Sequence, residues 1–462
     1  MKKLLLPICL FASLSACGSS DETAAAPPPV ATPAPANPPS GAADPITQPP
    51  PAAGAVKDPG PRIGVPGAGE PLAGLNHDQL VAFDEGKAAF QREFTVKAGL
   101  GPAMNLDNCA GCHSQPAVGG TSGAINPQVA FAAKRSATNA VPPFISVTGP
   151  SRIARFVKNA DGSLDGGGRN LFTIAGRADA PVDCKLAQPD FNKEFAANNI
   201  ATRIGLPLFG DGLLEQVPNQ ALIDNLARDA AAKAALGIRG KIADFGRLGW
   251  KAQFSSISAF SGAAFNAEIG LSNDLFPLEA ADTAVCQVAA VPNVIANLSA
   301  ASVGEGLSDN EKVANFIRFL APPVRSEDTP GGKDSIASGK TLFKSVGCAF
   351  CHTPQLRTGN ASVAALANKD FNPYSDLLLY DMGTGLADHV VQGPAGGQDW
   401  RATPLWGLGQ RLFFLHDGRT ADVREAILAH QSTGSEANAV IDKYIGLSDA
   451  EEQDLLNFLR SL

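Results

Sequence analysis

Two pentapeptides of the form Cys-x-x-Cys-His constrain this chain more than any other feature. They are CAGCH (residues 109–113) and CAFCH (residues 348–352). Two cysteines at this spacing on a single turn match the two vinyl groups of a haem, and the adjacent histidine then points at the iron. A thioredoxin-like motif would need a βαβ context and a zinc site a second ligand pair nearby, and neither surrounds the pentapeptides. The prediction is two covalently bound haem c groups, attached through Cys109, Cys112, Cys348 and Cys351, with His113 and His352 as iron ligands.

Apolar residues recur with helical spacing ahead of each motif. The segment DQLVAFDEGKAAFQREF (residues 78–94) leads into the first motif, and SIASGKTLFKSVG (residues 335–347) leads into the second. In both segments the large apolar residues fall close to one helical face, which predicts a helix that buries that face. A helix that leads into Cys-x-x-Cys-His is the cytochrome c arrangement, so each motif is expected to belong to a cytochrome c-like unit.

Two segments that resemble each other are expected to close these units. Residues 306–320 (GLSDNEKVANFIRFL) and 446–462 (GLSDAEEQDLLNFLRSL) both begin Gly-Leu-Ser-Asp and continue with apolar residues at helical spacing. Each contains a Ser-x-x-Glu capping box, which marks the start of a helix. The boxes are Ser308 with Glu311 and Ser448 with Glu451.

The predicted fold class is therefore mainly α, with two cytochrome c-like haem domains. The first domain carries a long irregular insertion with a few short strands, and a Pro- and Gly-rich hinge separates it from the second. The predicted organisation is a lipoprotein signal peptide and lipobox at 1–17, a disordered Pro/Ala-rich tether at 18–71, an N-terminal haem c domain at 72–322, a hinge at 323–335, and a C-terminal haem c domain at 336–462.

The N-terminus has the features of a secretory signal. Two lysines precede an apolar run that is shorter than the roughly 20 residues needed to span a bilayer, and the run ends in Leu-Ser-Ala-Cys at Cys17. This ending resembles the lipobox of bacterial lipoproteins, which implies cleavage before Cys17 and lipid on its sulfur. An ordinary signal peptide with an incidental cysteine is the alternative. Gly18, after the cysteine, favours the outer membrane by the same resemblance, so the expected location is periplasmic and lipid-anchored.

The segment that follows is rich in Pro, Ala and Gly and has few large apolar side chains, so it cannot bury a core and is predicted to be a tether. The formal net charge of the chain is -8. This charge argues against a nucleic-acid partner and against a basic membrane-binding patch.

Cys184 and Cys286 remain after the motif cysteines, Cys17 and the signal-peptide Cys9 are set aside. In an exported protein a disulfide between them is expected, because that compartment is oxidising. Two buried thiols are the alternative.

The number of iron ligands limits what two haems can do. The chain has six histidines, and apart from Met1 only Met104 and Met382 offer a thioether. A haem iron with a protein ligand on both faces is six-coordinate and carries electrons, whereas an iron that is open on one face can bind peroxide or dioxygen. No histidine lies in the long insertion from about residue 120 to 300, which should wrap the distal side of the first haem. The first haem is therefore expected to be open on that side.

The segment PLWGLGQRLFFLHDGRTADVREAILAH resembles the region after the second haem in the bacterial dihaem cytochrome c peroxidase superfamily. That resemblance places His416 in a His-Asp-Gly turn and His430 at the position of the distal ligand, so the second haem is expected to be bis-histidine. Glu215, in FGDGLLEQVP, resembles the distal acid of the peroxidases, and Trp250, in GRLGWKAQ, resembles their electron relay. Met382 and His389 are weaker candidates to ligate or cover an iron.

Further stretches are similar to the dihaem c-type oxidoreductase family that is also labelled thiol oxidoreductase, within the same superfamily. They extend from about residue 75 to the C-terminus and include GLGPAMNLDNCAGCHSQPAVGG, TIAGRADAPVDC, GLPLFGDGLLEQVP, FGRLGWKAQF, GCAFCHTPQLRTG, YSDLLLYDMGTGLADH, WRATPLWGLG and HDGR. The thiol label finds no support in the residues, because haem attachment would use both Cys-x-x-Cys pairs.

The predicted function is a peroxidase-like dihaem oxidoreductase. Electrons would enter from a small periplasmic donor, a cytochrome or cupredoxin, through the bis-histidine haem and pass to the open haem, which reduces peroxide or oxidises a substrate. Two alternatives stay open: a pure periplasmic electron-transfer dihaem cytochrome, and a dihaem oxygenase similar to the rubber-cleaving enzymes.

Overall fold

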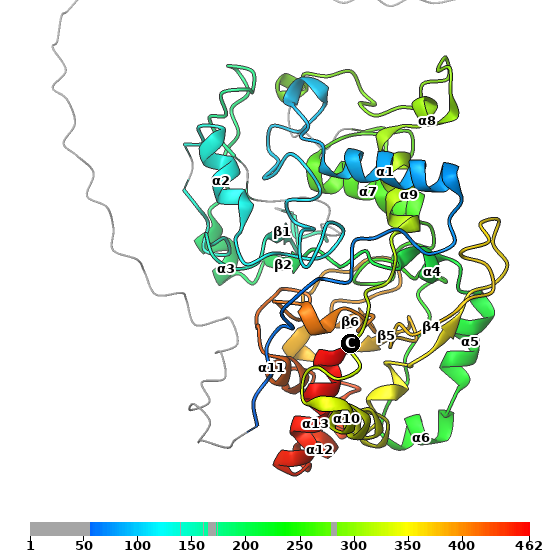
Figure 1. The fold of residues 1–462 in the computed structure, drawn as a ribbon. Coiled ribbons are helices and arrows are strands. Elements are labelled where there is room, and N and C mark those ends of the chain that lie inside the picture. The colour runs from blue at the N-terminus through cyan, green and yellow to red at the C-terminus, as the bar shows by residue number, and fades with distance from the viewer. Residues whose placement is uncertain (1–55, 139, 160, 165–171, 173, 279–283) are drawn as a thin grey trace, which may run out of the picture. The chain divides into compact units, whose positions relative to one another are not determined.

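A computed structural model describes residues 56–138, 140–159, 161–164, 172, 174–278 and 284–462 (Figure 1). The predicted signal peptide, Cys17 and most of the predicted tether lie outside these residues. No helix within the described part of the chain is long and apolar enough to cross a membrane.

Helices dominate the described residues, as predicted, and short strands form three two-stranded antiparallel ribbons. The α-helices are α1 (His77–Gln91), α2 (Pro127–Lys134), α3 (Phe191–Ala196), α4 (Asp211–Glu215), α5 (Asn219–Ala227), α6 (Ala230–Ala235), α7 (Ile257–Ile269), α8 (Val303–Gly306), α9 (Asp309–Phe319), α10 (Gly332–Val346), α11 (Val423–Leu428), α12 (Asn438–Ile445) and α13 (Asp449–Ser461). The strands are β1 (Arg152–Phe156), β2 (Ile200–Ile204), β3 (Leu356–Arg357), β4 (Asp370–Phe371), β5 (Leu379–Asp381) and β6 (Asp399–Arg401).

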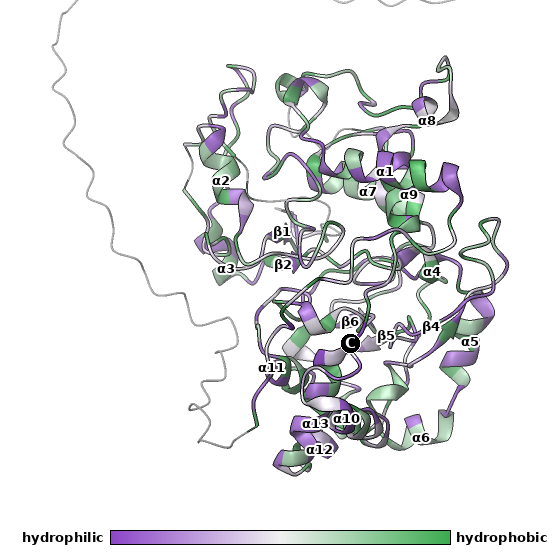
Figure 2. Ribbon diagram, in the orientation of Figure 1, coloured by the Kyte–Doolittle hydropathy of each residue, from purple (hydrophilic) through white to green (hydrophobic). Residues whose placement is uncertain are grey.

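The helix predicted ahead of the first motif is α1, and it packs on the predicted closing helix, α9 (Figure 1). The two backbones meet at Gly86, where a Cβ would lie 2.2 Å from the carbonyl oxygen of Lys312. Phe83 and Phe90 of α1 both stack on Phe316 of α9, with ring centroids 5.3 and 5.1 Å apart. Each of these buried rings contributes on the order of 1.5–3 kcal/mol. Figure 2 shows hydrophobic and hydrophilic residues on the same helices, as expected for helices that bury one face.

The second pair, α10 and α13, repeats this contact. A Cβ at Gly339 of α10 would lie 2.0 Å from the carbonyl oxygen of Asp454 on α13. The ring of Phe343, four residues after this glycine, packs on Phe458 at 5.4 Å. The sequence contains a pattern for this contact, Gly-Lys-x-x-Phe, in both helices. It occurs as GKAAF in α1 and as GKTLF in α10.

One of the two predicted capping boxes forms. Ser448 accepts a hydrogen bond from the N–H of Glu451, and the Glu451 side chain accepts from the N–H of Ser448. The box predicted at Ser308 was wrong, because the Ser308 side chain makes no cap hydrogen bond. Glu311 instead accepts from the Ser258 hydroxyl of α7 at 3.0 Å, so tertiary packing replaces the local cap.

Strands occur in the insertion, as predicted, and also in the C-terminal part, where none was predicted. In the insertion β1 pairs with β2, with Arg152 opposite Ile204. The C-terminal ribbons pair β3 with β4 and β5 with β6. These strands have two or three residues each, so they are too short to show an alternating pattern in the sequence.

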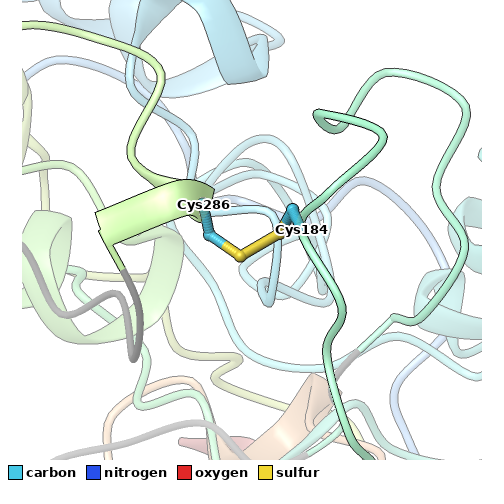
Figure 3. Close-up of a disulfide and its surroundings, with 2 residues drawn as sticks. All are labelled: Cys184 and Cys286. Atoms are coloured by element: carbon cyan, nitrogen blue, oxygen red, sulfur yellow. A yellow bond between two sulfur atoms is a disulfide. The ribbon is translucent and has the colours of Figure 1, made fainter. Parts of the chain in front are cut away.

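The insertion contains the expected disulfide between Cys184 and Cys286, which joins residues 102 apart in the sequence (Figure 3). Closing a loop of this length reduces the entropy of the unfolded chain, an effect of about 4–5 kcal/mol in the chain-entropy account. The bridge therefore holds together a long segment that has little regular structure of its own.

The later part of the insertion packs on the C-terminal part of the chain. Figure 1 shows α5 and α6 in the same half of the molecule as α10 and α13. The backbone of Lys241 pairs with that of Leu379 in β5, and the Asn225 side chain donates to the carbonyl oxygen of Asp376 at 3.2 Å. Arg203 of β2 forms a buried ion pair with Asp388. The insertion thus contacts both motif-bearing parts of the chain.

Residues 56–71, the end of the predicted tether, lie against the folded chain. Asp58 accepts two hydrogen bonds from the fully buried Arg460 of α13, at 2.7 and 2.6 Å, and one from the N–H of Val423. Pro71 pairs with Leu320. The packed part of the chain therefore begins by Asp58 and not at residue 72. The Asp58 carboxylate binds the buried Arg460 guanidinium, and the composition of the segment does not reveal this contact.

Asp58→Ala should lower the free energy of unfolding by about 3–5 kcal/mol, because it leaves the buried Arg460 guanidinium without its partner. Burial alone raises the pKa of Asp58, but the Arg460 and Val423 hydrogen bonds outweigh it and hold the pKa below the usual value. The stabilisation is thus present above about pH 4 and is lost as the pH falls through the lowered pKa.

Urea unfolding at pH 7 measures the change. Asp370→Ala is the matched control, because Asp370 pairs with Arg357 on the surface, with more than half of each side chain exposed. This pair should contribute less than about 1 kcal/mol. Equal losses in the two variants would contradict the prediction.

Candidate haem sites

The second Cys-x-x-Cys-His motif follows α10 with a single glycine between them. Gly347 has a φ of 114°, a left-handed conformation that favours glycine, and it ends the helix. The motif then forms one 3-10 turn, η3 (Cys348–Phe350), and the N–H of His352 donates to the carbonyl oxygen of Cys348 at 2.9 Å. This turn brings Cys348, Cys351 and His352 to the wall of one cavity.

The first motif forms the same turn but reaches it by a longer path. Residues 92–108 leave the end of α1 and return, and the N–H of Ala110 donates to the carbonyl oxygen of Phe90 in α1. The N–H of His113 then donates to the carbonyl oxygen of Cys109 at 3.1 Å. The His113 ring packs edge-on against Phe90, with centroids 5.9 Å apart.

All four motif cysteines are partly buried free thiols. Burial is the main cause that raises the pKa of Cys112 and Cys348 to about 12, and it also raises the pKa of Cys109 and Cys351. The nearby Glu268 carboxylate raises the pKa of Cys109 and Cys112 further. Redox-active cysteines have lowered pKa values. The surroundings therefore argue against a disulfide oxidoreductase.

A cavity of about 230 Å³ adjoins the second motif. Cys348, Cys351, His352 and His430 all line it, which is the set that the sequence predicted for the second haem. Apolar side chains provide much of the remaining wall, among them Phe343, Met382, Leu386, Trp406, Phe414, Val440, Leu455 and Leu459. A flat, mostly apolar ring fits a cavity with this lining.

The three predicted ligand histidines are held in the same way. In each ring Nδ1 lies within hydrogen-bond distance of a backbone carbonyl oxygen: Gly120 for His113 (2.9 Å), Tyr374 for His352 (3.1 Å) and Ala426 for His430 (2.8 Å). A carbonyl oxygen can only accept, so Nδ1 carries the proton and Nε2 keeps a lone pair. Fixing one ring nitrogen in this way orients the other toward a metal.

The two histidines of the second site are also uncharged near neutral pH. Burial, followed by the neighbouring His430, lowers the pKa of His352 to about 4. Burial lowers the pKa of His430 as well. Two neutral imidazoles on the wall of one apolar cavity, each with Nε2 available, fit a haem iron with histidine on both faces.

The cavity extends toward the first motif. Gln115, Pro116 and Thr121, in the turn after His113, belong to its lining. The Thr121 hydroxyl donates to the carbonyl oxygen of Gly205 at 2.6 Å, and Gly205 lies against the His113 ring. A Cβ at Gly205 would be 2.9 Å from Cε1 and 3.1 Å from Nε2 of that ring. Glycine is therefore needed here because no side-chain atom fits beside the imidazole.

Trp250 lies between the two sites. Its Nε1 donates to the carbonyl oxygen of Ile204 at 3.0 Å, next to Gly205, and its ring also lines the cavity. Trp250 meets Trp400 edge to face at 6.1 Å, and Trp400 stacks on His416 at 4.0 Å.

The two tryptophans differ in their electrostatic surroundings. Lys251 Nζ lies 4.3 Å and the Arg203 guanidinium 5.4 Å from the centroid of the Trp400 ring. Both of these cations are ion-paired with the buried Asp388, which compensates much of their charge. Arg411 lies 6.0 Å from the centroid of the Trp250 ring.

Both carboxylate oxygens of Glu215, the predicted distal acid, accept hydrogen bonds. One oxygen accepts from the N–H of Ile257 at the start of α7 at 2.7 Å, and the other accepts from Arg318 at 3.1 Å. Asp211, on the preceding turn of α4, is buried. Burial, opposed by Arg401 and reinforced by Glu215, raises the pKa of Asp211 to about 7. Asp211 lies in the same segment as Glu215, FGDGLLEQVP, where no sequence pattern marks it as a functional residue.

The weaker ligand candidates separate in the structure. Met382 lines the cavity, whereas the side chain of His389 is exposed and does not line it. Met104 is buried against Gly101 and Gly270, in the part of the chain that carries the first motif.

A sequence model of the family described as "Di-haem oxidoreductase, putative peroxidase" matches residues 154–462. The chain belongs to this family, which confirms the resemblance found in the sequence. The match includes the second motif and His430, and it begins after the first motif. A search of curated proteins finds no match.

Two solved structures are similar at low identity. A MauG-like protein associated with microbial copper homeostasis is 16% identical, with 87% of this chain and 93% of that chain covered and a TM-score of 0.29. Hydrazine synthase of Kuenenia stuttgartiensis is 17% identical, with 35% of this chain covered and a TM-score of 0.22. The match spans 56% of the length of that hydrazine synthase chain.

Gly205→Ala should disturb the first site alone. The added methyl group pushes on the His113 ring, so we expect an altered or lost electron paramagnetic resonance signal from the first haem and an unchanged signal from the second. Gly446→Ala is the control, since a Cβ there meets its nearest atom at 3.5 Å and no left-handed φ is involved. An altered second-haem signal in Gly205→Ala would contradict the assignment.

Asp211→Asn should make the protein more stable than the wild type at pH 8 and equally stable near pH 4. The folded pKa is about 7 and the usual value is 3.8, so the unfolded chain releases the proton first as the pH rises. Wild-type stability should fall relative to the variant by up to about 1.4 kcal/mol per pH unit across this window. Urea unfolding at several pH values measures the difference, and a constant offset would refute the prediction.

Proposed function

We propose that this protein is a dihaem c-type cytochrome of the peroxidase kind with two unequal haems. Cys348 and Cys351 would attach the second haem, and His352 and His430 would hold its iron. The first haem is attached through Cys109 and Cys112, with His113 as its protein ligand.

One observation carries the proposal: His352 and His430 line the same cavity as both attachment cysteines. An iron with two imidazoles is six-coordinate and transfers single electrons without binding substrate. No histidine of the sequence between residues 114 and 351 is available to the first haem, so its distal position remains for a small oxidant. This asymmetry supports peroxide reduction over simple electron transfer.

The chain supplies the path between the two sites. Trp250 lines the second site's cavity and donates to Ile204, the neighbour of the residue that packs on His113. We assign Trp250 as the electron relay.

Peroxide cleavage also requires a proton that is accepted from one oxygen and returned to the other. Glu215 is the proposed acid, and it must release Arg318 or Ile257 to act. The buried Asp211 carboxyl, with a pKa of about 7, can exchange a proton near neutral pH without breaking an ion pair. Asp211 and Glu215 are therefore proposed to work together, with Glu215 supplying the proton and Asp211 replenishing it.

The cellular context is part of the proposal. The lipobox resemblance supports attachment through Cys17 to the outer membrane on the periplasmic side. A small periplasmic cytochrome or cupredoxin would donate electrons to the second haem. Dioxygen in place of peroxide at the first haem is the second candidate reaction, and the open distal position serves it equally.

The test uses mature protein produced with a haem-attachment system. A pyridine haemochrome count should give two haems, and electron paramagnetic resonance should show one low-spin and one high-spin ferric species. Peroxide consumption with a reduced donor should exceed dioxygen consumption. Two low-spin species without turnover would instead indicate a pure electron-transfer protein.

His430→Ala should remove or shift the low-spin signal and leave the high-spin signal intact, because the second iron loses an imidazole. Peroxide turnover should fall at least tenfold, since electrons no longer pass through a six-coordinate haem. His77→Ala is the control, because His77 is exposed at the start of α1 and does not line the cavity. Loss of the high-spin species in His430→Ala would reverse the assignment of the two haems.

A further inference from the structure

Two arginines line the cavity of the second site, and both have hydrogen-bonding atoms without partners. Nε and Nη2 of Arg411 are buried and make no hydrogen bond within the described residues, and the same holds for Nε of Arg401. Both side chains thus bring unused donors to a cavity whose wall is mostly apolar.

Burying the unpaired hydrogen-bond donors of Arg411 costs free energy. A buried polar group without a partner costs about 1–3 kcal/mol, and a charged one costs more. Burial is the only cause that acts on Arg411, and it lowers the pKa of this guanidinium to about 10. Native proteins rarely leave such groups unsatisfied, so the pattern indicates an anionic group that completes the site when bound.

The positions of the free atoms define the chemistry of that group. Nε and Nη2 form one edge of the guanidinium, from which two N–H bonds point in parallel. This fork matches the two oxygens of a carboxylate. Arg401 adds a single free Nε on the same cavity, while its Nη1 donates to the carbonyl oxygen of Arg247.

The backbone around Arg411 is held from two sides. Its carbonyl oxygen accepts from Arg460 of α13 at 2.9 Å. The carbonyl oxygen of the preceding residue, Gln410, accepts from Gln115 at 3.2 Å, in the turn after the first motif. The backbone of Arg411 is therefore held between the C-terminal helix and the turn after the first motif.

We propose that Arg411 binds a propionate carboxylate of the second haem through Nε and Nη2, with Arg401 as a second donor on the same cavity. This inference rests on the proposed attachment of a haem at Cys348 and Cys351. Arg411 is a cofactor-binding residue that also tunes the haem. Its positive charge favours the reduced iron, which raises the reduction potential, and keeps the carboxylate ionised across the neutral pH range.

The experiment measures the reduction potentials of both haems by spectroelectrochemistry between pH 5.5 and 8.5, in the wild type and in Arg411→Gln, Arg411→Lys and Arg357→Gln. In Arg411→Gln the potential of the second haem should fall. Its carboxylate should also titrate in the neutral range, so the potential should decline with pH where the wild type is flat.

Arg411→Lys keeps the charge without the fork, so it should retain most of the wild-type potential but show part of the pH dependence. Arg357→Gln removes an exposed, ion-paired arginine and should match the wild type. If Arg411→Gln fails to bind haem, the Arg411→Lys variant tests the inference instead. A reduction potential of the second haem that is as independent of pH in Arg411→Lys as in the wild type would overturn the inference.

An unchanged potential and pH profile of the second haem in Arg411→Gln would also overturn it. A response confined to the first haem would show that the carboxylate belongs there and refute the assignment to the second. The haem count of the wild type keeps the two proposals separate. A wild type without a second haem would end the proposed function, whereas a loaded wild type with an unresponsive Arg411→Gln would end this inference alone.

Discussion

The close approach of two helices at a glycine is the contact on which each half of the molecule depends. At Gly86 and Gly339 a single added carbon would lie within 2.2 Å of a carbonyl oxygen on the partner helix. Only glycine lets the backbones come so near, and the phenylalanine four residues later then packs on a phenylalanine of the partner helix. Because each Cys-x-x-Cys-His turn is anchored at the end of such a helix, the crossing determines where its cysteines and histidine lie over the core.

The polar groups around the two sites fall into two classes, those with a hydrogen-bond partner in the protein and those without one. The Nδ1 atoms of the ligand histidines are bonded to backbone carbonyl oxygens, so their direction is set by the fold and not by the cofactor. Two guanidinium groups still have free donors. In the proposed dihaem protein, the fixed groups would hold the iron and the free groups would provide charge for the periphery of the ring. A mostly apolar wall makes both effects stronger than they would be in water.

Much of the fold and of the candidate site could be predicted from the sequence. The two motifs, the helices before them and the helices that close each unit follow from local spacing and periodicity. His430 followed from resemblance, and the structure places it on the cavity wall. Other features could not be predicted. The Ser308 box fails because Glu311 finds a tertiary partner, the packed chain begins by Asp58 because Arg460 is buried opposite it, and the C-terminal strands are too short to leave a pattern.

The sequence by itself determined which chemistry is available: two cysteine pairs, each with an adjacent histidine, and a small supply of further ligands. Those are properties of neighbouring residues on one turn, where spacing alone controls geometry. Only the tertiary structure decided which distant residues share a cavity. His352 and His430 meet there, Trp250 lies beside the neighbour of His113, and Arg411 reaches the same wall, because helix crossings and the packing of the insertion bring together segments that no local pattern connects.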